Sequence, residues 1–254
     1  MYKYFVLGSL LLFGASCNAK HDSEPGPQSI HPATVNIATD VSTLEPDLNE
    51  PIESFSDDSN IGRRKKNKVL IDVFELPDSS ARYKPNNRAI VKFYSLTASK
   101  DWELKQTIEV ESHALSEAAP IIEDFNNDGL KDITFVSDTA ARGANVVRTL
   151  LIYDKLDDVL VPVKNSADYP NLSYNKTLNC IDAWMFHGAT TTVFLKLEGD
   201  MLREFASVDT GAELVVTVTN KDGKEREIMR KTMREDDIYT RYRTFNPPRP
   251  YFAR

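Results

Sequence analysis

The sequence predicts a mostly β fold, with antiparallel hairpins arranged as a propeller-like array or as an irregular sandwich. It contains ten tyrosines and twelve phenylalanines among 254 residues, and valine and threonine are frequent. β-branched and aromatic side chains pack well on a pleated, half-buried surface. From Val69 onward, short apolar runs alternate with clusters of turn residues. Pairs of such runs recur every few tens of residues with a similar pattern, which favours a repeated antiparallel architecture.

Four pairs of apolar runs, each joined by a turn, define the expected hairpins. They are 91–96 with 102–108, 149–153 with 159–163, 192–197 with 201–205, and 214–219 with 225–228. The last turn, 221–223, contains Asp-Gly, the strongest short hairpin signal of the four. Helix is expected to be minor, with a turn or two within 78–83 or 112–119. The proline-rich tail 245–252 is expected to pack in an extended form, since proline disfavours regular structure.

Residues 1–16 predict a secretory signal peptide. Lys3 provides a positive charge, residues 5–13 form an apolar stretch, and residues 14–16 are small. A stretch of about nine apolar residues is too short to cross a bilayer, which needs roughly 20. Cys17 directly follows the small residues, and this arrangement resembles a bacterial lipobox with Gly14 in place of the usual leucine. The resemblance implies acylation of Cys17 and a membrane anchor. The alternative is an ordinary cleaved signal followed by a coincidental cysteine.

The rest of the chain divides at residue 66. Residues 17–66 are rich in Asp, Glu, Ser, Asn and Pro. A segment of this kind cannot bury enough apolar surface to offset its ordering entropy, so it predicts a lipidated N-terminus and a flexible tether. The basic run 63–66 is interpreted as a solvated linker boundary. Residues 67–254 are the expected β-rich domain. Asn18, after the cysteine, favours the outer membrane, on its periplasmic or its surface face.

Residues 124–132, Asp-Phe-Asn-Asn-Asp-Gly-Leu-Lys-Asp, predict a calcium-binding loop. Oxygen ligands at loop positions 1, 3 and 5 can converge on one ion, and glycine adopts the required turn at position 6 at least cost. The expected ligands are Asp124, Asn126, Asp128, the carbonyl of Leu130, and Asp132. An EF-hand would need a glutamate at position 12, where this chain has Phe135 within an expected strand. The loop is therefore not an EF-hand.

The loop resembles the FG-GAP/VCBS-type calcium loop, D-x-[DN]-x-D-G-x-x-D followed by an aliphatic residue and a strand. Further features, at 143–145, 151–154, 170–172 and 187–188, resemble in their order a group of periplasmic lipoproteins with a calcium loop. That group includes lysozyme-inhibitor-type immunity proteins of secretion systems. The resemblance covers roughly residues 88–208. It implies a protein partner, with a cell-wall hydrolase as the most concrete version, and carries over no inhibitory residue.

Several classes of function are disfavoured. The net charge of −7 argues against a nucleic-acid partner, because phosphate binding needs a basic surface. No zinc-type spacing, nucleophile elbow or phosphate-cradling glycine loop is present. Cys180 is expected to be a buried thiol. Residues 184–187 predict either a buried strand or an aromatic binding patch.

These observations favour a non-enzymatic, lipid-anchored envelope protein with one structural calcium ion. Two alternatives stay open. One is an enzyme that acts on envelope glycans through paired carboxylates, which sequence alone does not exclude. The other is a structural surface lipoprotein without a small ligand.

Overall fold

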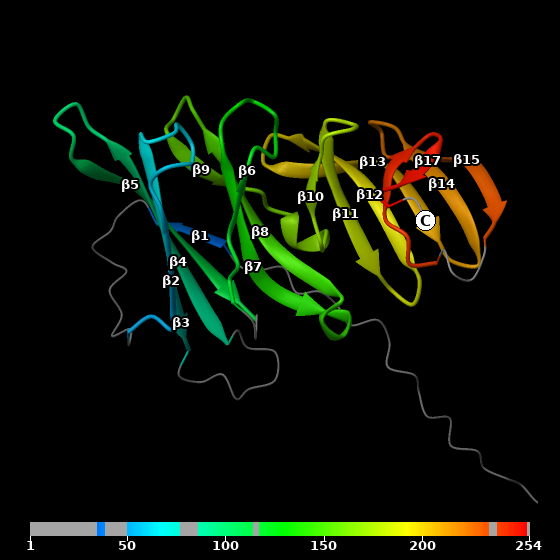
Figure 1. The fold of residues 1–254 in the computed structure, drawn as a ribbon, viewed down its shortest axis with the longest axis horizontal. Coiled ribbons are helices and arrows are strands. Elements are labelled where there is room, and N and C mark those ends of the chain that lie inside the picture. Colours follow the sequence, from blue (N-terminus) through cyan, green and yellow to red (C-terminus); the bar gives the residue numbers. More distant parts are fainter. Residues whose placement is uncertain (1–34, 39–49, 77–85, 114–116, 234–237, 253–254) are drawn as a thin grey trace, which may run out of the picture.

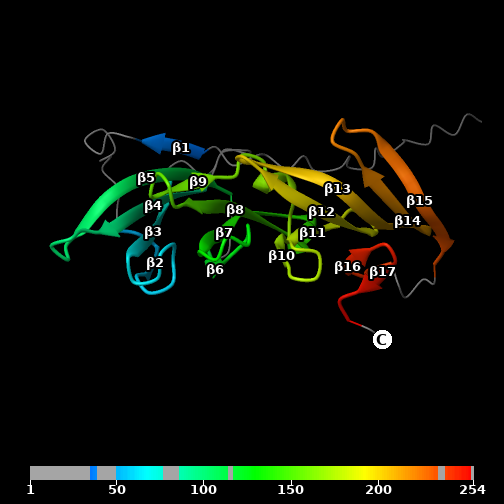
Figure 2. The same cartoon turned by 90° about the horizontal axis from the view of Figure 1, so that it is seen from above.

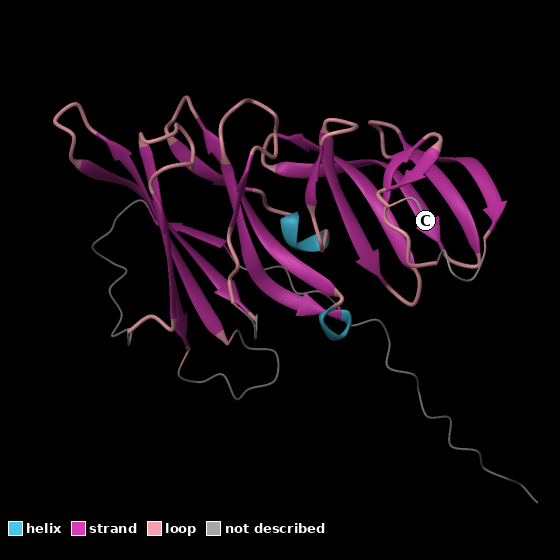
Figure 3. Cartoon of the chain, viewed as in Figure 1, coloured by secondary structure: helices cyan, strands magenta, loops and turns pink. Residues whose placement is uncertain are grey.

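The computed structural model describes residues 35–38, 50–76, 86–113, 117–233 and 238–252, and nearly all of their regular structure is β-strand (Figure 3). The prediction of a mostly β, antiparallel fold is confirmed. The described strand pairs are all antiparallel. Two single-turn 3₁₀ helices, η2 (Ala141–Gly143) and η3 (Ser166–Asp168), are described beside them.

The strands form three sheets in chain order, followed by a short hairpin (Figure 1). The first sheet has the order β1-β5-β4-β3-β2 and contains β1 (Val35–Ala38), β2 (Glu53–Asp57), β3 (Asn67–Glu75), β4 (Asn87–Leu96) and β5 (Trp102–Ser112). The second sheet contains β6 (Ile121–Glu123), β7 (Asp132–Ala140), β8 (Asn145–Asp154) and β9 (Val159–Pro162) in sequential order.

The third sheet also follows chain order. It contains β10 (Ser173–Asn175), β11 (Cys180–Phe186), β12 (Thr190–Glu198), β13 (Met201–Thr210), β14 (Glu213–Thr219) and β15 (Glu225–Thr232). The terminal hairpin consists of β16 (Tyr242–Phe245) and β17 (Pro248–Pro250). The four hairpins predicted from the sequence are confirmed as β4–β5, β8–β9, β12–β13 and β14–β15.

The sheets are stacked face to face, with the second in the middle. On β8, Leu151 and Tyr153 join a core cluster with residues of the first sheet, whereas Leu150 and Ile152 join a cluster with residues of the third. Successive strand residues point to opposite faces, so a strand covered on both faces is apolar throughout. Each neighbouring pair of sheets therefore encloses a core as in a sandwich, and no sheet of the described chain closes into a barrel.

The outer face of the third sheet is covered by the terminal hairpin. Phe194, Val208 and Val216 of the sheet form a core cluster with Tyr242, and Phe245 packs against it. Figure 2 shows the β16–β17 hairpin lying over this face. The hairpin closes the stack at the end where no further sheet follows.

Polar side chains connect the second sheet to its neighbours. Asn145 donates from Nδ2 to the carbonyl of Phe186 at 3.0 Å and accepts from the Phe186 N–H at 2.8 Å, so one side chain joins β8 to β11. On the other side, Asp158 accepts from the Tyr153 hydroxyl at 2.8 Å and from the Ser95 hydroxyl at 2.6 Å. These bonds hold the stack in register at its loop ends.

Asp158 also accepts from the side-chain amide of Asn67 at 3.0 Å and pairs with Arg63 at 2.7 Å. Burial by itself raises the pKa of Asp158, but the hydrogen bonds from Ser95, Tyr153 and Asn67 and the charge of Arg63 outweigh it and hold the pKa below its usual value.

Two sequence-based expectations need correction. The folded part of the chain begins before residue 67, because β2 pairs with β3 in the first sheet, Ile61 is fully buried, and β1 pairs with β5. β2 is an edge strand with a mostly polar sequence, so it was not predicted. It is stabilised mainly by pairing with β3. The tail 245–252 is not merely extended. Pro248 and Pro250 lie in β17, whose outer side has no further strand to receive an N–H, and Pro247 lies in the turn before it.

Some expected features lie outside the described residues, including the signal peptide, Cys17 and the possible helical turn at 78–83. At 112–119, the described residues end β5 and continue without helix. Among the described residues, no helix has the length and apolar character needed to cross a bilayer.

Candidate functional site

The predicted calcium loop connects β6 to β7 at the upper edge of the stack in Figure 1. Asn127 and Gly129 adopt positive φ angles of 60° and 86°, and this left-handed backbone turns the loop tightly. Asp124 spans the turn. One of its carboxylate oxygens accepts from the N–H of Asp128 at 3.1 Å, and the other accepts from the N–H of Gly129 at 2.9 Å.

Asn126 and Asp128 complete the inner surface of this turn. Asn126 donates from Nδ2 to Asp128 Oδ2 at 3.0 Å, and its Oδ1 accepts from the N–H of Asp128 at 3.1 Å. Asp128 Oδ1 accepts from the N–H of Leu130 at 2.8 Å. The first three predicted ligand side chains are thus brought together in one turn. The half-buried Leu130 packs against the core cluster between the first and second sheets.

Asp132, at position 9, is fully buried and lies below the turn. Its Oδ2 accepts from the N–H of Phe125 at 2.7 Å, and its Oδ1 accepts from the N–H of Tyr153 at 2.9 Å. This carboxylate therefore ties both ends of the loop to β8. Its pKa is raised to about 7, chiefly by burial; the negative charges of Asp128 and Asp124 add to the rise, and the two N–H donors oppose it.

The loop carries negative charge without a cationic partner. Within the described chain, no lysine, arginine or histidine forms an ion pair with Asp124, Asp128 or Asp132. These residues do not form a closed cage either, since no group of three or more His, Cys, Asp or Glu side chains in the described residues is arranged to hold a metal ion. The donor chemistry nevertheless fits a hard cation, because carboxylate and amide oxygens are the ligands of calcium.

The loop is fixed to the first sheet through an isolated β-bridge. Gly62 donates its N–H to the carbonyl of Lys131 at 2.8 Å, and the N–H of Lys131 faces the carbonyl of Gly62 at 3.4 Å. Gly62 has a φ of 54°, and a Cβ there would lie 2.8 Å from Oδ1 of Asn67. The positive φ and the closeness of the Asn67 side chain therefore favour glycine at this position.

A pocket of about 660 Å³ opens beside the loop, between the second and third sheets. Its wall is formed by three turns: the loop 124–132, the β8–β9 turn and the β12–β13 turn. The lining residues are Asn126, Asp128, Ile152, Tyr153, Asp154, Lys155, Leu156, Val161, Val163, Leu197, Gly199 and Asp200. This pocket could not be predicted from the sequence, because the turns that form its wall are far apart in the chain.

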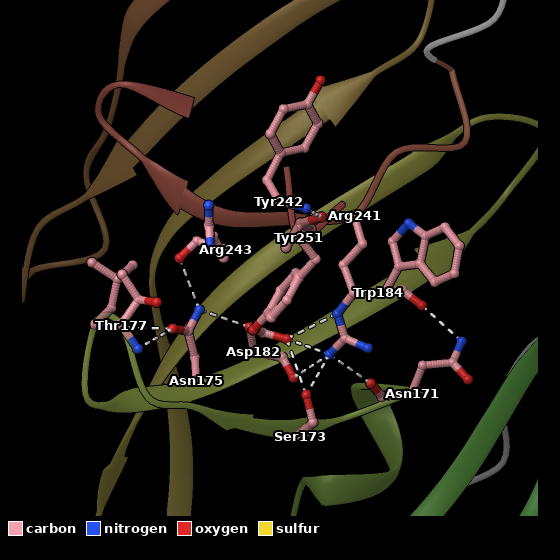
Figure 4. Close-up of polar contacts among 12 residues, drawn as sticks. Asn171, Ser173, Asn175, Thr177, Asp182, Trp184, Arg241, Tyr242, Arg243 and Tyr251 are labelled. Atoms are coloured by element: carbon pink, nitrogen blue, oxygen red, sulfur yellow. Dashed lines mark hydrogen bonds and ion pairs between the residues drawn. The ribbon is translucent and has the colours of Figure 1, made fainter. Parts of the chain in front are cut away.

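A second polar cluster, centred on Asp182, was also missed by sequence reasoning (Figure 4). The buried carboxylate forms an ion pair with Arg241, the residue before the terminal hairpin, and accepts from the hydroxyl of Tyr251, the residue after it. It also accepts from the side-chain amide of Asn175 at 2.7 Å, and Arg241 donates to the Ser173 hydroxyl at 2.7 Å. The carboxylate thus joins Arg241 and Tyr251 near the C-terminus to Asn175 of β10, so we interpret the cluster as the attachment of the hairpin to the sheet.

The predicted aromatic patch is divided between two faces of β11. Trp184 and Phe186 contact each other with ring centroids 4.3 Å apart, and Phe186 stacks on the exposed Tyr239. Met185 points the other way, into the core between the second and third sheets. The indole N–H of Trp184 is buried and has no acceptor within the described part of the chain.

The remaining predicted residue with a described position is Cys180. It is a buried free thiol, as expected, and burial, with the nearby charge of Asp182, raises its pKa to about 12. A thiol in this environment stays protonated and unreactive.

Comparisons with known proteins assign no family. No protein-family model matches the chain, and no curated protein matches it. Among solved structures, the chain is similar to one described as the structure of a Xanthomonas type IV secretion system related protein, with a TM-score of 0.41 and 13% sequence identity. The similarity covers 72% of this chain and 97% of that chain. A likeness this distant says nothing about the function of this chain.

Proposed function

We propose that this chain is a non-enzymatic, lipid-anchored protein of the bacterial outer membrane, whose loop 124–132 binds one structural calcium ion. The observation that carries the proposal is the gathering of Asp124, Asn126 and Asp128 in one turn above the buried Asp132, without a basic partner in the described chain. Each carboxylate oxygen accepts one backbone or amide donor and keeps a further lone pair for an ion.

The calcium ion has a structural role in this proposal. Asp132 links the loop to β8, and Gly62 links it to the first sheet, so an ion that orders the loop also holds these two sheets together. An ion in the loop would stabilise the native protein by mass action, since the unfolded chain lacks the turn.

Calcium binding is tested by thermal unfolding of the metal-stripped protein with and without calcium. We expect calcium at 100 times its dissociation constant to stabilise the protein by about 2.7 kcal/mol. Asp124→Ala and Asp128→Ala should abolish this response, whereas Asp222→Ala, in the exposed β14–β15 turn, should preserve it. Variants of the loop that respond to calcium as the wild type does would contradict the proposal.

The partner is proposed to be a protein, most concretely a cell-wall hydrolase that the chain inhibits. The support is the resemblance of the calcium loop and of the later sequence features to lysozyme-inhibitor-type proteins, together with the pocket of three turns beside the loop. Muramidase assays with and without the purified protein test inhibition. No inhibition, combined with no lysozyme-like protein captured from envelope extracts, argues against this version.

The anchor is proposed to be the acylated Cys17. Cys17→Ser should release the protein from the membrane fraction and abolish incorporation of a labelled fatty acid. A Cys17→Ser protein that stays in the membrane fraction would exclude this anchor.

A further inference from the structure

The pocket beside the calcium loop combines an apolar floor with a charged rim. Its floor consists of buried or half-buried side chains from the second and third sheets, including Ile152, Val163 and Leu197. The floor is continuous with the core between these sheets. An occupant must therefore present an apolar stem to the floor, because desolvating a polar group there without a partner is unfavourable.

Three carboxylates and one lysine line the rim. Asp128, Asp154 and Asp200 come from three different turns, and Lys155 is the one lining cation among these described residues. Asp128 is also a proposed ligand of the calcium ion, so Asp154 and Asp200 are the carboxylates that remain for an occupant. Asp154 uses Oδ1 to accept from the N–H of Leu156 at 2.7 Å, and its Oδ2 has no partner in the described structure. Asp200 pairs with Lys164 at 2.6 Å through Oδ2, which leaves its Oδ1 as a free acceptor.

We propose that this pocket receives a basic side chain of the partner protein, preferentially arginine. The aliphatic part of an arginine would cover the apolar floor, while the guanidinium would reach the carboxylates at the rim. Arginine suits two carboxylates on separate turns, because its five N–H donors point in fixed, divergent directions. The inference rests on the proposed function in one respect only, that the partner is a protein.

Leu156 extends the same surface. It lies at the tip of the β8–β9 turn with 92% of its surface exposed, next to the pocket it lines. An exposed leucine beside the pocket provides an apolar contact next to the ionic one, and arginine is among the residues enriched at protein interfaces.

The experiment uses the tripeptide Ac-Gly-Arg-Gly-NH₂ as probe and the isotopically labelled full-length protein without its signal peptide. NMR titration follows the backbone amides of Leu156 and Gly199, which both line the pocket. The matched control probe replaces arginine by citrulline, which keeps the shape and removes the charge. We expect the arginine peptide to shift these amides in a saturable manner and the citrulline peptide to bind more weakly.

Three variants test the rim. Asp154→Asn and Asp200→Asn keep a side-chain acceptor and should each weaken binding of the arginine peptide by about two- to fivefold, the range for exposed ion pairs. Lys155→Gln removes the repelling charge and should strengthen binding. Asp222→Asn, in the exposed turn 220–223, carries the same charge change away from the pocket and should leave binding unchanged.

Equal binding of the arginine and citrulline peptides, or no shift at Leu156 and Gly199, overturns the inference. The inference is also overturned if Asp154→Asn binds the arginine peptide as the wild type does and the control Asp222→Asn binds it more weakly. These outcomes concern the pocket alone, so they are distinguishable from a failure of calcium binding or of hydrolase inhibition.

Discussion

Asp182→Ala is expected to detach the terminal hairpin and to destabilise the whole stack. The Asp182 side chain is fully buried, and Arg241 retains 21% exposure. Removing the carboxylate leaves Arg241, the Tyr251 hydroxyl and the Asn175 amide without their shared acceptor. Breaking a buried ion pair from one side costs about 3–5 kcal/mol. Arg241 keeps the Asn171 carbonyl at 3.1 Å and some contact with water, so the lower end of that range applies, about 3 kcal/mol.

The assay is equilibrium unfolding in urea, with thermal unfolding beside it. A loss of about 3 kcal/mol should lower the melting temperature by roughly 6–12 °C for a domain of this size. The companion variant Arg241→Met and the double variant complete a cycle, in which the double loss should be smaller than the sum of the two single losses. Limited proteolysis should cut the Asp182→Ala protein in the hairpin before the sheets are cut.

The exposed ion pair between Glu213 and Arg230 supplies the control. It has a similar geometry, with 2.5 Å between charged atoms, but both side chains are more than two-fifths exposed. Glu213→Gln should therefore cost less than about 1 kcal/mol. If Asp182→Ala costs no more than Glu213→Gln, or if the two single variants of the cycle add without coupling, the ion pair does not fasten the hairpin.

Further predictions concern other parts of the fold. Gly62→Ala should destabilise by about 1–3 kcal/mol in urea unfolding, because it combines a positive φ with a Cβ 2.8 Å from Asn67 Oδ1, whereas Gly223→Ala, at a φ of 75° with open space around it, should cost less. Equal costs would show that the close approach to Asn67 is relieved easily. The lowered pKa of Asp158 contributes stability above its unfolded pKa near 3.8, and this is lost as the pH falls through the folded value; the acid unfolding curve of Asp158→Asn should therefore be flatter than that of the wild type in this range. An Asp158→Asn protein with the same acid unfolding curve as the wild type would refute this contribution of Asp158. Phe135→Ala should cost about 3–5 kcal/mol, because Phe135 is fully buried between the first and second sheets, and a smaller loss would indicate that the cavity collapses.

The strands were predictable where the local pattern was sufficient. The hairpin at 214–228 has an Asp-Gly turn between two β-branched or charged runs, and the structure places β14 and β15 there. The loop 124–132 was predictable for the same reason, since the positions of its oxygen side chains and of Gly129 within nine residues set its turn. β2 was not predictable, because Glu53-Ser54-Phe55-Ser56-Asp57 has one apolar residue and is stabilised by pairing with β3.

The sequence by itself determined the antiparallel hairpins and the turn that gathers Asp124, Asn126 and Asp128, because both depend on residues close together in the chain. The tertiary structure alone decided which faces meet. It directed Asp132 inward to β8, brought Asp154 and Asp200 to one pocket, and paired Asp182 with Arg241 across 59 positions of sequence. The physical reason is that sheet stacking depends on the burial of whole faces, a property summed over distant strands, whereas turns depend on the backbone preferences of a few adjacent residues.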